Sequence, residues 1–516
     1  MLSNQAARLL PVLTVNPSDS GQQVRQLQIL IIGSGFSGIG LAIRLKQVGI
    51  KDFLILEAER GVGGTWWLNR YPGCACDVQS HLYSLSFVPK ADWSRQFAGR
   101  AEIQRYLADC VDRHALADHI VLSTRVEQAR WRDGERVWQV LDQRGNVYRS
   151  RVLVSAIGGL SRAAWPAIPG LDEFAGSVIH SQRWPEHLEL RDRRIAVIGT
   201  GASAVQFVPH LQREAAQLDV YQRSAQWILP KPDRPIRPWQ KTLYRRVPAA
   251  RRLVRLGLFA LLESRLPAFA RWPRLTAYHR HKALAHLRGQ VRDPALQRKL
   301  LPDYAMGCKR VLMSNDYYPA IAAPNVNLVT IPIAHIDSRG ITDREGHHRA
   351  ADLLILGTGF QAADPVPPGL IIGRDSLDLA TAWRHGPVAY KGSTVPGFPN
   401  FFTLLGPNTA LGHNSVVLMI EGQIRYVISA LRWMQRHGHE TIEVRPRPTQ
   451  AWDADLQHRL KQSVWQRGRC SSWYQHPDSG RIPTLWPRFT FSFRWLLRKF
   501  DPAAYRVDRP SSTLRP

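Results

Sequence analysis

Apolar strand-like runs that end in glycine turns are the strongest pattern in this 516-residue chain. Residues 28–57 begin with such a run, turn at G-S-G-F-S-G, continue through a helical stretch rich in Ala and Leu, and close with a second apolar run. Gly33 permits the tight turn, Gly35 lets the backbone approach a pyrophosphate, and Gly38 lets helix and strand pack closely. The helix N-terminus attracts anions, and Glu57 is placed to accept hydrogen bonds from ribose hydroxyls. The segment predicts a dinucleotide-binding βαβ unit.

A second unit of the same kind follows at residues 194–223. Arg223 lies 24 residues after Gly199, the same separation as Glu57 from Gly33. A carboxylate at this position favours a free ribose, whereas an arginine accommodates a 2′-phosphate. A solvated surface charge is the alternative interpretation of Arg223, because arginine is common in this chain. We predict FAD on the first unit and NADPH on the second, with the second cofactor held by Gly199, Gly201, Ala202, Ser203 and Arg223.

Each unit is followed, further along the chain, by an apolar run that ends in glycine, at residues 152–159 and 352–357. This repetition suggests that the second domain is inserted within the first. The predicted fold class is α/β, with two dinucleotide-binding (Rossmann-like) domains, the NADP domain inserted in the FAD domain, and an additional helical insertion. We predict a flexible N-terminal extension at residues 1–24 and a tail at residues 511–516. The FAD-binding domain has two parts, residues 25–165 and residues 351–510, and the second part also carries substrate-site elements. The NADP-binding domain covers residues 166–350 and contains the helical insertion at about residues 235–300.

Residues 235–300 are rich in arginine and carry scattered leucines rather than strand patterns. The apolar segment within them, residues 253–266, is too short and too charged to cross a bilayer. A basic amphipathic helix can lie on a membrane surface, which keeps peripheral membrane contact as an alternative. We favour a helical insertion that packs on the second dinucleotide-binding unit.

The cysteine content limits the redox chemistry that the chain can carry. The five cysteines are few, odd in number and without zinc-site spacing: Cys74, Cys76, Cys110, Cys308 and Cys470. They argue against a disulfide framework and for a reducing compartment. Cys74 and Cys76 are the only close pair, and they lack the separation of a redox motif, so we interpret both as small residues in a turn. No metal site is predicted.

Length and charge limit the class of protein and its partners. A chain of this length is longer than one hydrophobic core usually serves, so two or three domains are expected. The net charge of +28 allows nucleic acid, a membrane surface or anionic ligands as partners. No helix-turn-helix, zinc-finger or RNA-binding sheet pattern is present, so we predict no nucleic-acid partner. The N-terminus lacks a clear cleavage signal, which predicts a cytoplasmic protein.

Two long gapped motifs resemble those of the Baeyer–Villiger monooxygenases. Residues 174–185, FAGSVIHSQRWP, match F-x-G-x-x-x-H-x-x-x-W, followed by Pro or Asp, at every fixed position. The second motif also matches, with GGTW at residues 63–66, YPG at residues 71–73 and then Asp77. Trp184 stands where the related flavin monooxygenases that oxidise nitrogen and sulfur usually have Tyr or Phe. The resemblance extends from about residue 28 to about residue 490, and it adds to the cofactor-binding residues Gly64, Thr65, Trp66 and Asp77.

The resemblance implies that NADPH reduces the flavin, that O2 adds to it, and that the peroxyflavin converts a small-molecule ketone to an ester or lactone. A deprotonated peroxide requires a fixed cation and shielding from water, and an arginine stays protonated at any working pH. By the match of the segment G-C-K-R-V, Arg310 stabilises the peroxide and the adduct, and Asp77 orients Arg310. The expected catalytic residues are therefore Arg310 and Asp77. Lys309 is expected to face the NADPH 2′-phosphate beside Arg223.

Several alternatives remain open on the sequence alone. The same peroxyflavin could oxidise nitrogen or sulfur, although Trp184 favours ketones. A flavin disulfide or quinone reductase would need a redox cysteine pair near the flavin. The two intact dinucleotide-binding units argue against a non-catalytic binding protein. By the resemblance, His180 couples domain positions rather than contacting substrate, and Trp473 could line the active site. The sequence does not indicate the oligomeric state.

Overall fold

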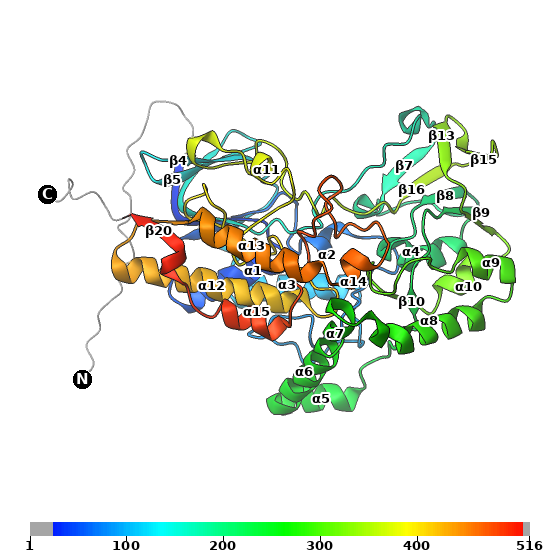
Figure 1. Cartoon of the computed structure of the whole chain (residues 1–516), viewed down its shortest axis with the longest axis horizontal. Coiled ribbons are helices and arrows are strands. Elements are labelled where there is room, and N and C mark those ends of the chain that lie inside the picture. Colours follow the sequence, from blue (N-terminus) through cyan, green and yellow to red (C-terminus); the bar gives the residue numbers. More distant parts are fainter. Residues whose placement is uncertain (1–23, 509–516) are drawn as a thin grey trace.

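The structure, a computed structural model, describes residues 24–508 and consists of two α/β domains side by side, with a helical protrusion below them (Figure 1). All but the last residue of the predicted N-terminal extension, and the whole of the predicted tail, lie outside the described residues. Each domain is built on a sheet whose buried apolar strands are covered by helices, as parallel strands require. The predicted fold class is confirmed.

The first domain, at the left of Figure 1, is built on an eight-stranded sheet with the order β17-β4-β5-β6-β1-β2-β3, in which β18 also pairs with β6. β1 lies between β2 and β6 and runs parallel to both. The last four residues of β1 are all buried, because both of its faces are covered. The strands are β1 (Val24–Ile32), β2 (Phe53–Leu56), β3 (Ile120–Val121), β4 (Val126–Arg132), β5 (Val137–Asp142), β6 (Val147–Ser155), β17 (Ile371–Ile372) and β18 (Phe401–Thr403).

The largest apolar core of the molecule joins β1 and β6 to helices α1 and α12, which pack against each other. The helices of this domain are α1 (Phe36–Gln47), α2 (Thr65–Leu68), α3 (Arg100–Arg113), α11 (Leu379–Ala382), α12 (Val416–His437), α13 (Pro446–Leu460), α14 (Val464–Arg467) and α15 (Thr490–Leu496). A separate antiparallel pair, β19 (Thr441–Val444) and β20 (Tyr505–Asp508), ends the described chain. The first dinucleotide-binding unit is therefore held by contacts with both parts of its domain.

The second domain, at the right of Figure 1, is built on a parallel five-stranded sheet with the order β12-β9-β8-β16-β7. These strands are β7 (Ser177–His180), β8 (Arg194–Ile198), β9 (Gln217–Tyr221), β12 (Val326–Val329) and β16 (Leu353–Leu356). Helices α4 (Ala202–Gln212) and α10 (Tyr317–Ile321) pack against each other beside the sheet. Two small sheets complete the domain. The first pairs β10 (Ile228–Leu229) with β11 (Leu312–Met313), and the second consists of β13 (Ile333–Asp337), β14 (Gly340–Asp343) and β15 (His348–Ala350). β16 belongs to this sheet although it follows the boundary that we predicted at residue 350.

The second domain is inserted in the first, as predicted, because β17 and β18 return to the first sheet after β16 has joined the second. The two segments that cross between the domains pair with each other. Ala163 forms an antiparallel bridge with Phe360, and the Ala164 N–H donates to the Gly359 carbonyl oxygen at 2.9 Å. The two crossings therefore form a single paired connection.

The predicted helical insertion consists of α5 (Pro238–Arg246), α6 (Pro248–Glu263), α7 (Leu266–Ala270), α8 (Ala277–Gln290) and α9 (Pro294–Lys299). Its packing is only partly as expected. α8 contacts the second domain, and Leu287 lies in the core of that domain. The inner face of α6 packs instead on the core of the first domain, through Val254, Leu258 and Phe259. Among the described residues, no helix combines the length and apolar character needed to span a membrane.

Candidate active site

The turn after β1 has the shape that a pyrophosphate cradle requires. Gly33 has a φ of +102°, and a Cβ atom there would lie 2.8 Å from the Ala156 carbonyl oxygen, so only glycine fits. A Cβ on Gly38 would lie 2.0 Å from the Gly33 oxygen, which explains the close packing of helix and strand. Gly35 is the N-cap of α1 without a side-chain cap, and a Cβ there would meet only the Gly64 Cα, at 3.8 Å. The first N–H groups of α1 are therefore open to an anion, as FAD requires.

Glu57 follows β2 with its carboxylate already fixed in place. Its side chain is buried and accepts hydrogen bonds from the Ser34 N–H at 2.8 Å, the Ser34 hydroxyl at 2.7 Å and the Glu59 N–H at 2.9 Å. A carboxylate has about four acceptor positions, so capacity remains for a ribose hydroxyl. The residue fits the role that the sequence predicted.

The start of α2 lies against the first cradle and carries the predicted cofactor residues Gly64, Thr65 and Trp66. The Gly63 N–H donates to the Ser34 carbonyl oxygen at 3.0 Å. A Cβ on Gly64, whose φ is +55°, would lie 3.1 Å from the Gly35 Cα. The two glycine turns therefore touch, and a ligand on the α1 N-terminus also meets the α2 N-terminus.

The second cradle repeats the geometry of the first. Gly199 has a φ of +108°, and a Cβ there would lie 2.5 Å from the Gly357 carbonyl oxygen. Gly201 is the N-cap of α4, again without a side-chain cap, and its own Cβ would meet only that same oxygen, at 4.0 Å. Ala202 and Ser203 begin α4 and are not buried, so the predicted NADP-binding residues line an accessible helix N-terminus.

Two cations meet at the outer end of the second cradle. The Lys309 ammonium donates to the Ser224 hydroxyl at 2.6 Å and lies 4.8 Å from the centre of the Tyr304 ring. Burial, and then the positive charge of Arg223, lower the pKa of Lys309. Two cations that repel each other beside a hydroxyl form a site for a doubly charged anion. The structure thus brings together the two residues that we expected at the 2′-phosphate.

Asp77 and Arg310 form an ion pair between the domains. The Arg310 Nε donates to an Asp77 carboxylate oxygen at 2.5 Å, and the Arg310 Nη1 donates to the Leu411 carbonyl oxygen at 3.3 Å. The two side chains are 28% and 33% exposed, for Arg310 and Asp77 respectively. Arg310 precedes β11 in the second domain, whereas Asp77 and Leu411 lie in loops of the first. The guanidinium is therefore held from two sides while part of it stays accessible.

The electrostatics of this pair favour two permanent charges. The negative charge of Asp77 raises the pKa of Arg310, even though burial acts in the opposite direction. Burial alone would raise the pKa of Asp77, but the charge and hydrogen bond of Arg310 outweigh it, and the pKa is lowered. Arg310 is consequently a cation at every working pH.

Tyr474 is a further neighbour of this pair that sequence reasoning missed. Its side chain is buried, and its pKa is raised by burial and by Asp77 against the opposing effect of Arg310. Its hydroxyl has no hydrogen bond of normal geometry within residues 24–508. The preceding Trp473, which we expected near the site, is 44% exposed. Nothing in the spacing of two consecutive aromatic residues indicates which of them points inward.

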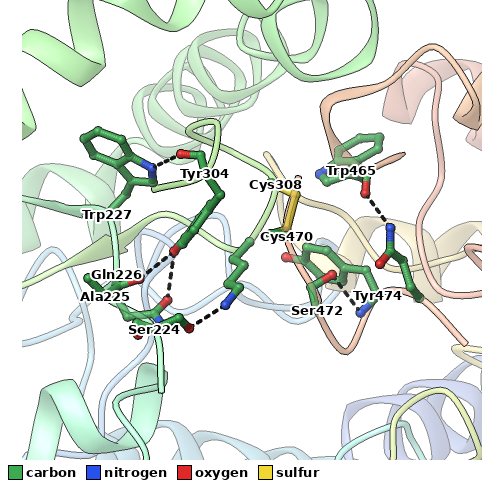
Figure 2. Close-up of a disulfide and its surroundings, with 12 residues drawn as sticks. Ser224, Ala225, Gln226, Trp227, Tyr304, Cys308, Trp465, Cys470, Ser472 and Tyr474 are labelled. Carbon is green, nitrogen blue, oxygen red and sulfur yellow. Dashed lines mark hydrogen bonds between the residues drawn. A yellow bond between two sulfur atoms is a disulfide. The ribbon is translucent and has the colours of Figure 1, made fainter. Parts of the chain in front are cut away.

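Our expectation that the cysteines stay unpaired is wrong for two of them. Cys308 and Cys470 form a disulfide, whereas Cys74, Cys76 and Cys110 are free (Figure 2). The partners are 162 residues apart, so spacing does not reveal the pair. The bond lies next to Lys309 and Arg310 and joins the second domain to the loop that carries Tyr474.

Two motif residues have structural positions away from the ion pair. Trp184 is buried in the core of the second domain, with its ring 5.5 Å from that of Phe207. His180 ends β7, accepts a hydrogen bond from the Gln182 N–H at 3.1 Å, and has its ring 6.0 Å from that of Phe360 on the paired crossing. This position beside the crossing is compatible with the expected role of His180 in coupling the domains.

Comparisons with known proteins agree with the two dinucleotide-binding sites described above. The family described as "Pyridine nucleotide-disulphide oxidoreductase" matches residues 30–254. A protein of Pseudomonas aeruginosa named Baeyer-Villiger monooxygenase is 48% identical over 96% of this chain and 94% of its own, and one of that name from Streptomyces coelicolor is 41% identical over 95% and 94%. A solved structure of oxidized steroid monooxygenase bound to NADP is 30% identical, with a TM-score of 0.82, and covers 93% of this chain and 99% of its own.

The two cradles and the ion pair between them therefore define a flavin-dependent monooxygenase with two dinucleotide-binding domains, and its cofactors are FAD and NADP(H). Within that class, the chain belongs to the Baeyer–Villiger monooxygenases.

Proposed function

We propose that this protein uses NADPH and O2 to insert an oxygen atom beside the carbonyl of a small-molecule ketone, giving an ester or lactone, and that Arg310 is the residue on which the oxygen transfer depends. The observation that carries the proposal is the Arg310–Asp77 pair, a permanent cation that is held between the domains and remains partly accessible. Bound FAD would supply the redox chemistry, since it accepts a hydride from NADPH and then activates O2.

The residues of this chain contribute charge, position and shielding. Arg310 presents a positive charge where negative charge develops on oxygen during the attack on the carbonyl group. Asp77 and the Leu411 carbonyl oxygen orient the guanidinium, so that little reorganisation is needed during the reaction. The buried ring of Tyr474 helps to exclude water from the same place.

The nicotinamide cofactor would be held at its two anionic groups, the pyrophosphate and the 2′-phosphate. The open N-terminus of α4 would face the pyrophosphate, and Arg223 with Lys309 would face the 2′-phosphate. In the first cradle, Gly33, Gly35 and Gly38 would hold the pyrophosphate of FAD, and Glu57 would hold a ribose. This arrangement leaves the region between the cradles, where Asp77 and Arg310 meet, for the substrate.

The test is to follow NADPH oxidation, ester formation and release of hydrogen peroxide in parallel for the Arg310→Ala variant with a cyclic ketone. Loss of a fixed donor to a developing oxyanion costs about 100- to 1000-fold in rate. We therefore expect ester formation to fall about 100-fold or more, while NADPH still reduces the flavin and hydrogen peroxide is released instead.

The matched control is Arg149→Ala, which removes an arginine from another ion pair, Arg149–Glu135 at 2.6 Å, near the start of β6 and so at the opposite end of that strand from the first cradle. Ester formation at the wild-type rate in Arg310→Ala would contradict the role of Arg310. Absence of any ester from the wild-type protein, with sulfoxide formed from a paired sulfide, would contradict the ketone as substrate.

The location of the protein is a separate part of the proposal. The low cysteine content supports a cytoplasmic protein, but the Cys308–Cys470 disulfide argues for an oxidising compartment. We propose the cytoplasm, with the bond shielded on the side of Cys308, which is fully buried, whereas Cys470 is partly buried. Alkylation of free thiols in intact cells, followed by mass spectrometry of the peptides that contain Cys308 and Cys470, measures the state of the pair directly.

A further inference from the structure

Within residues 24–508, no part of the chain covers the apolar outer face of α6. Leu253, Leu256 and Leu261 are 67%, 60% and 52% exposed, and Leu256 and Leu261 follow Leu253 by three and eight residues, spacings that place all three toward one side of the helix. The inner side of the same helix packs on the first domain. α6 is thus apolar on two faces, and only one of them is buried, which is unusual for a helix on a water-exposed surface.

The neighbouring helix α5 extends this uncovered surface. Trp239 and Leu243 are exposed one turn apart, and Val247 between the two helices is exposed as well. In Figure 1, α5 and α6 project together from the lower edge of the molecule. We call this surface, residues 237–263, the basic protrusion. A contiguous exposed apolar patch that projects from a protein marks an interaction site.

The accessible charges of the basic protrusion are positive. Residues 237–263 contain seven arginine and lysine residues and one acidic residue. That acid, Glu263, is buried and accepts a hydrogen bond from the Asn414 side chain at 2.6 Å. Within the described chain, six of the cations form no ion pair, and they are Arg237, Lys241, Arg245, Arg246, Arg251 and Arg252. Asp92, which feels the charge of Arg245, already pairs with Lys90 at 2.7 Å.

We propose that the basic protrusion docks on the surface of an anionic lipid bilayer. Leucine and tryptophan side chains that project beside arginines suit the boundary between acyl chains and headgroups, where apolar groups enter the bilayer and cations meet phosphates. The charge argues against a second copy of this chain as the occupant, because the same cations would face each other across a two-fold interface. The leucines argue against nucleic acid, because they offer no contact to phosphates or base edges.

The experiment is co-sedimentation of the FAD-loaded protein with vesicles in 0.1 M salt. Vesicles of phosphatidylcholine alone are compared with vesicles that contain one third phosphatidylglycerol. We expect binding only to the anionic vesicles, weakened when the salt concentration is raised. Each basic residue near an anionic surface contributes about 1 kcal/mol. The double variant Arg245→Glu/Arg246→Glu should therefore bind at least about ten-fold more weakly.

The apolar contribution is tested with Leu253→Gln/Leu256→Gln, which should also bind about ten-fold more weakly. Matched controls replace exposed residues elsewhere, Leu122→Gln/Leu377→Gln for the apolar change and Arg144→Glu/Arg191→Glu for the charge change, and they should bind like the wild-type protein. Oxidation of a soluble ketone should be unchanged in all four.

Three outcomes would overturn the proposal. The first is a wild-type protein that does not sediment with anionic vesicles, and the second is controls that lose as much binding as the protrusion variants. The third is a dimer, measured by light scattering without vesicles, that becomes a monomer in Leu253→Gln/Leu256→Gln, because the surface would then be an interface between copies of the chain.

Discussion

The two cradles share one backbone design and differ in the charged residue that comes after the second strand. Both turn at a glycine with a φ near +100°, and in both a Cβ at that glycine would collide with the carbonyl oxygen of the residue that follows the neighbouring parallel strand, Ala156 after β6 or Gly357 after β16. At the equivalent later position, however, Glu57 is buried and fixed by Ser34, whereas Arg223 is exposed.

The difference teaches how one fold can hold a resident cofactor and an exchangeable one. A carboxylate that is buried and hydrogen-bonded in advance costs little further ordering when its ligand binds, which favours tight binding. An exposed arginine beside Lys309 attracts a phosphate but must be ordered by it. We infer that the first cradle keeps FAD through many cycles, while the second releases NADP⁺.

The largest effect is expected from the matched variants Gly33→Ala and Gly199→Ala. Each puts a methyl group within 3 Å of a carbonyl oxygen at a backbone conformation that alanine rarely adopts. Gly33→Ala should lose most of its bound FAD and with it all activity. Gly199→Ala should keep its FAD but show a KM for NADPH raised ten-fold or more. Flavin absorbance and steady-state kinetics distinguish the two, and equal loss of FAD in both variants would refute the assignment of the cradles.

A smaller and more selective effect is expected from Arg223→Ala and Lys309→Met. Hydrogen bonds to charged groups contribute about 1.5–3 kcal/mol, so each variant should lose about 10- to 100-fold in kcat/KM for NADPH. NADH lacks the 2′-phosphate, and its kcat/KM should change little. Glu57→Gln, at the matched position of the first cradle, should leave the ratio between the two cofactors unchanged. An equal loss of kcat/KM for NADH would show that Arg223 and Lys309 do not recognise the 2′-phosphate.

The smallest expected effect is on the pH dependence of the KM for NADPH. Lys309 attracts a phosphate only while it is protonated, and burial and Arg223 both lower its pKa from the usual lysine value of 10.5. The KM for NADPH should therefore rise as the pH increases through this lowered pKa, while the KM for NADH stays level. In Arg223→Ala one cause is removed, so the rise should move to higher pH. Profiles measured between pH 7 and 10 test this, and an unshifted rise in the variant would contradict the coupling.

The local parts of the site were predictable from the sequence. A strand, a glycine turn and a helix follow each other within 30 residues, so the turns at Gly33 and Gly199 and the positions of Glu57 and Arg223 after the second strands could be predicted from spacing alone. The pairing of Asp77 with Arg310 joins residues 233 positions apart, and it was expected only through the resemblance to a family.

The parts that depend on three-dimensional packing were not predictable. Cys308 and Cys470 meet because two domains pack together, and no local pattern records that contact. The same holds for Tyr474, which is buried while its neighbour Trp473 is exposed. The helix α6 has an apolar pattern that fits either domain, and only the structure shows that its inner face lies on the first.

The disulfide changes the mechanics of the molecule. The paired crossings at residues 162–164 and 359–361 are one hydrogen-bonded connection between the two domains. Cys308–Cys470 adds a third covalent connection at a distance along the chain from those crossings, and so turns an open linkage into a closed one. Rotation that separates Arg310 from the Tyr474 loop is then limited by the slack in the loops around the two cysteines. In the oxidised protein, the disulfide therefore limits how far the second domain can move away from the Tyr474 loop.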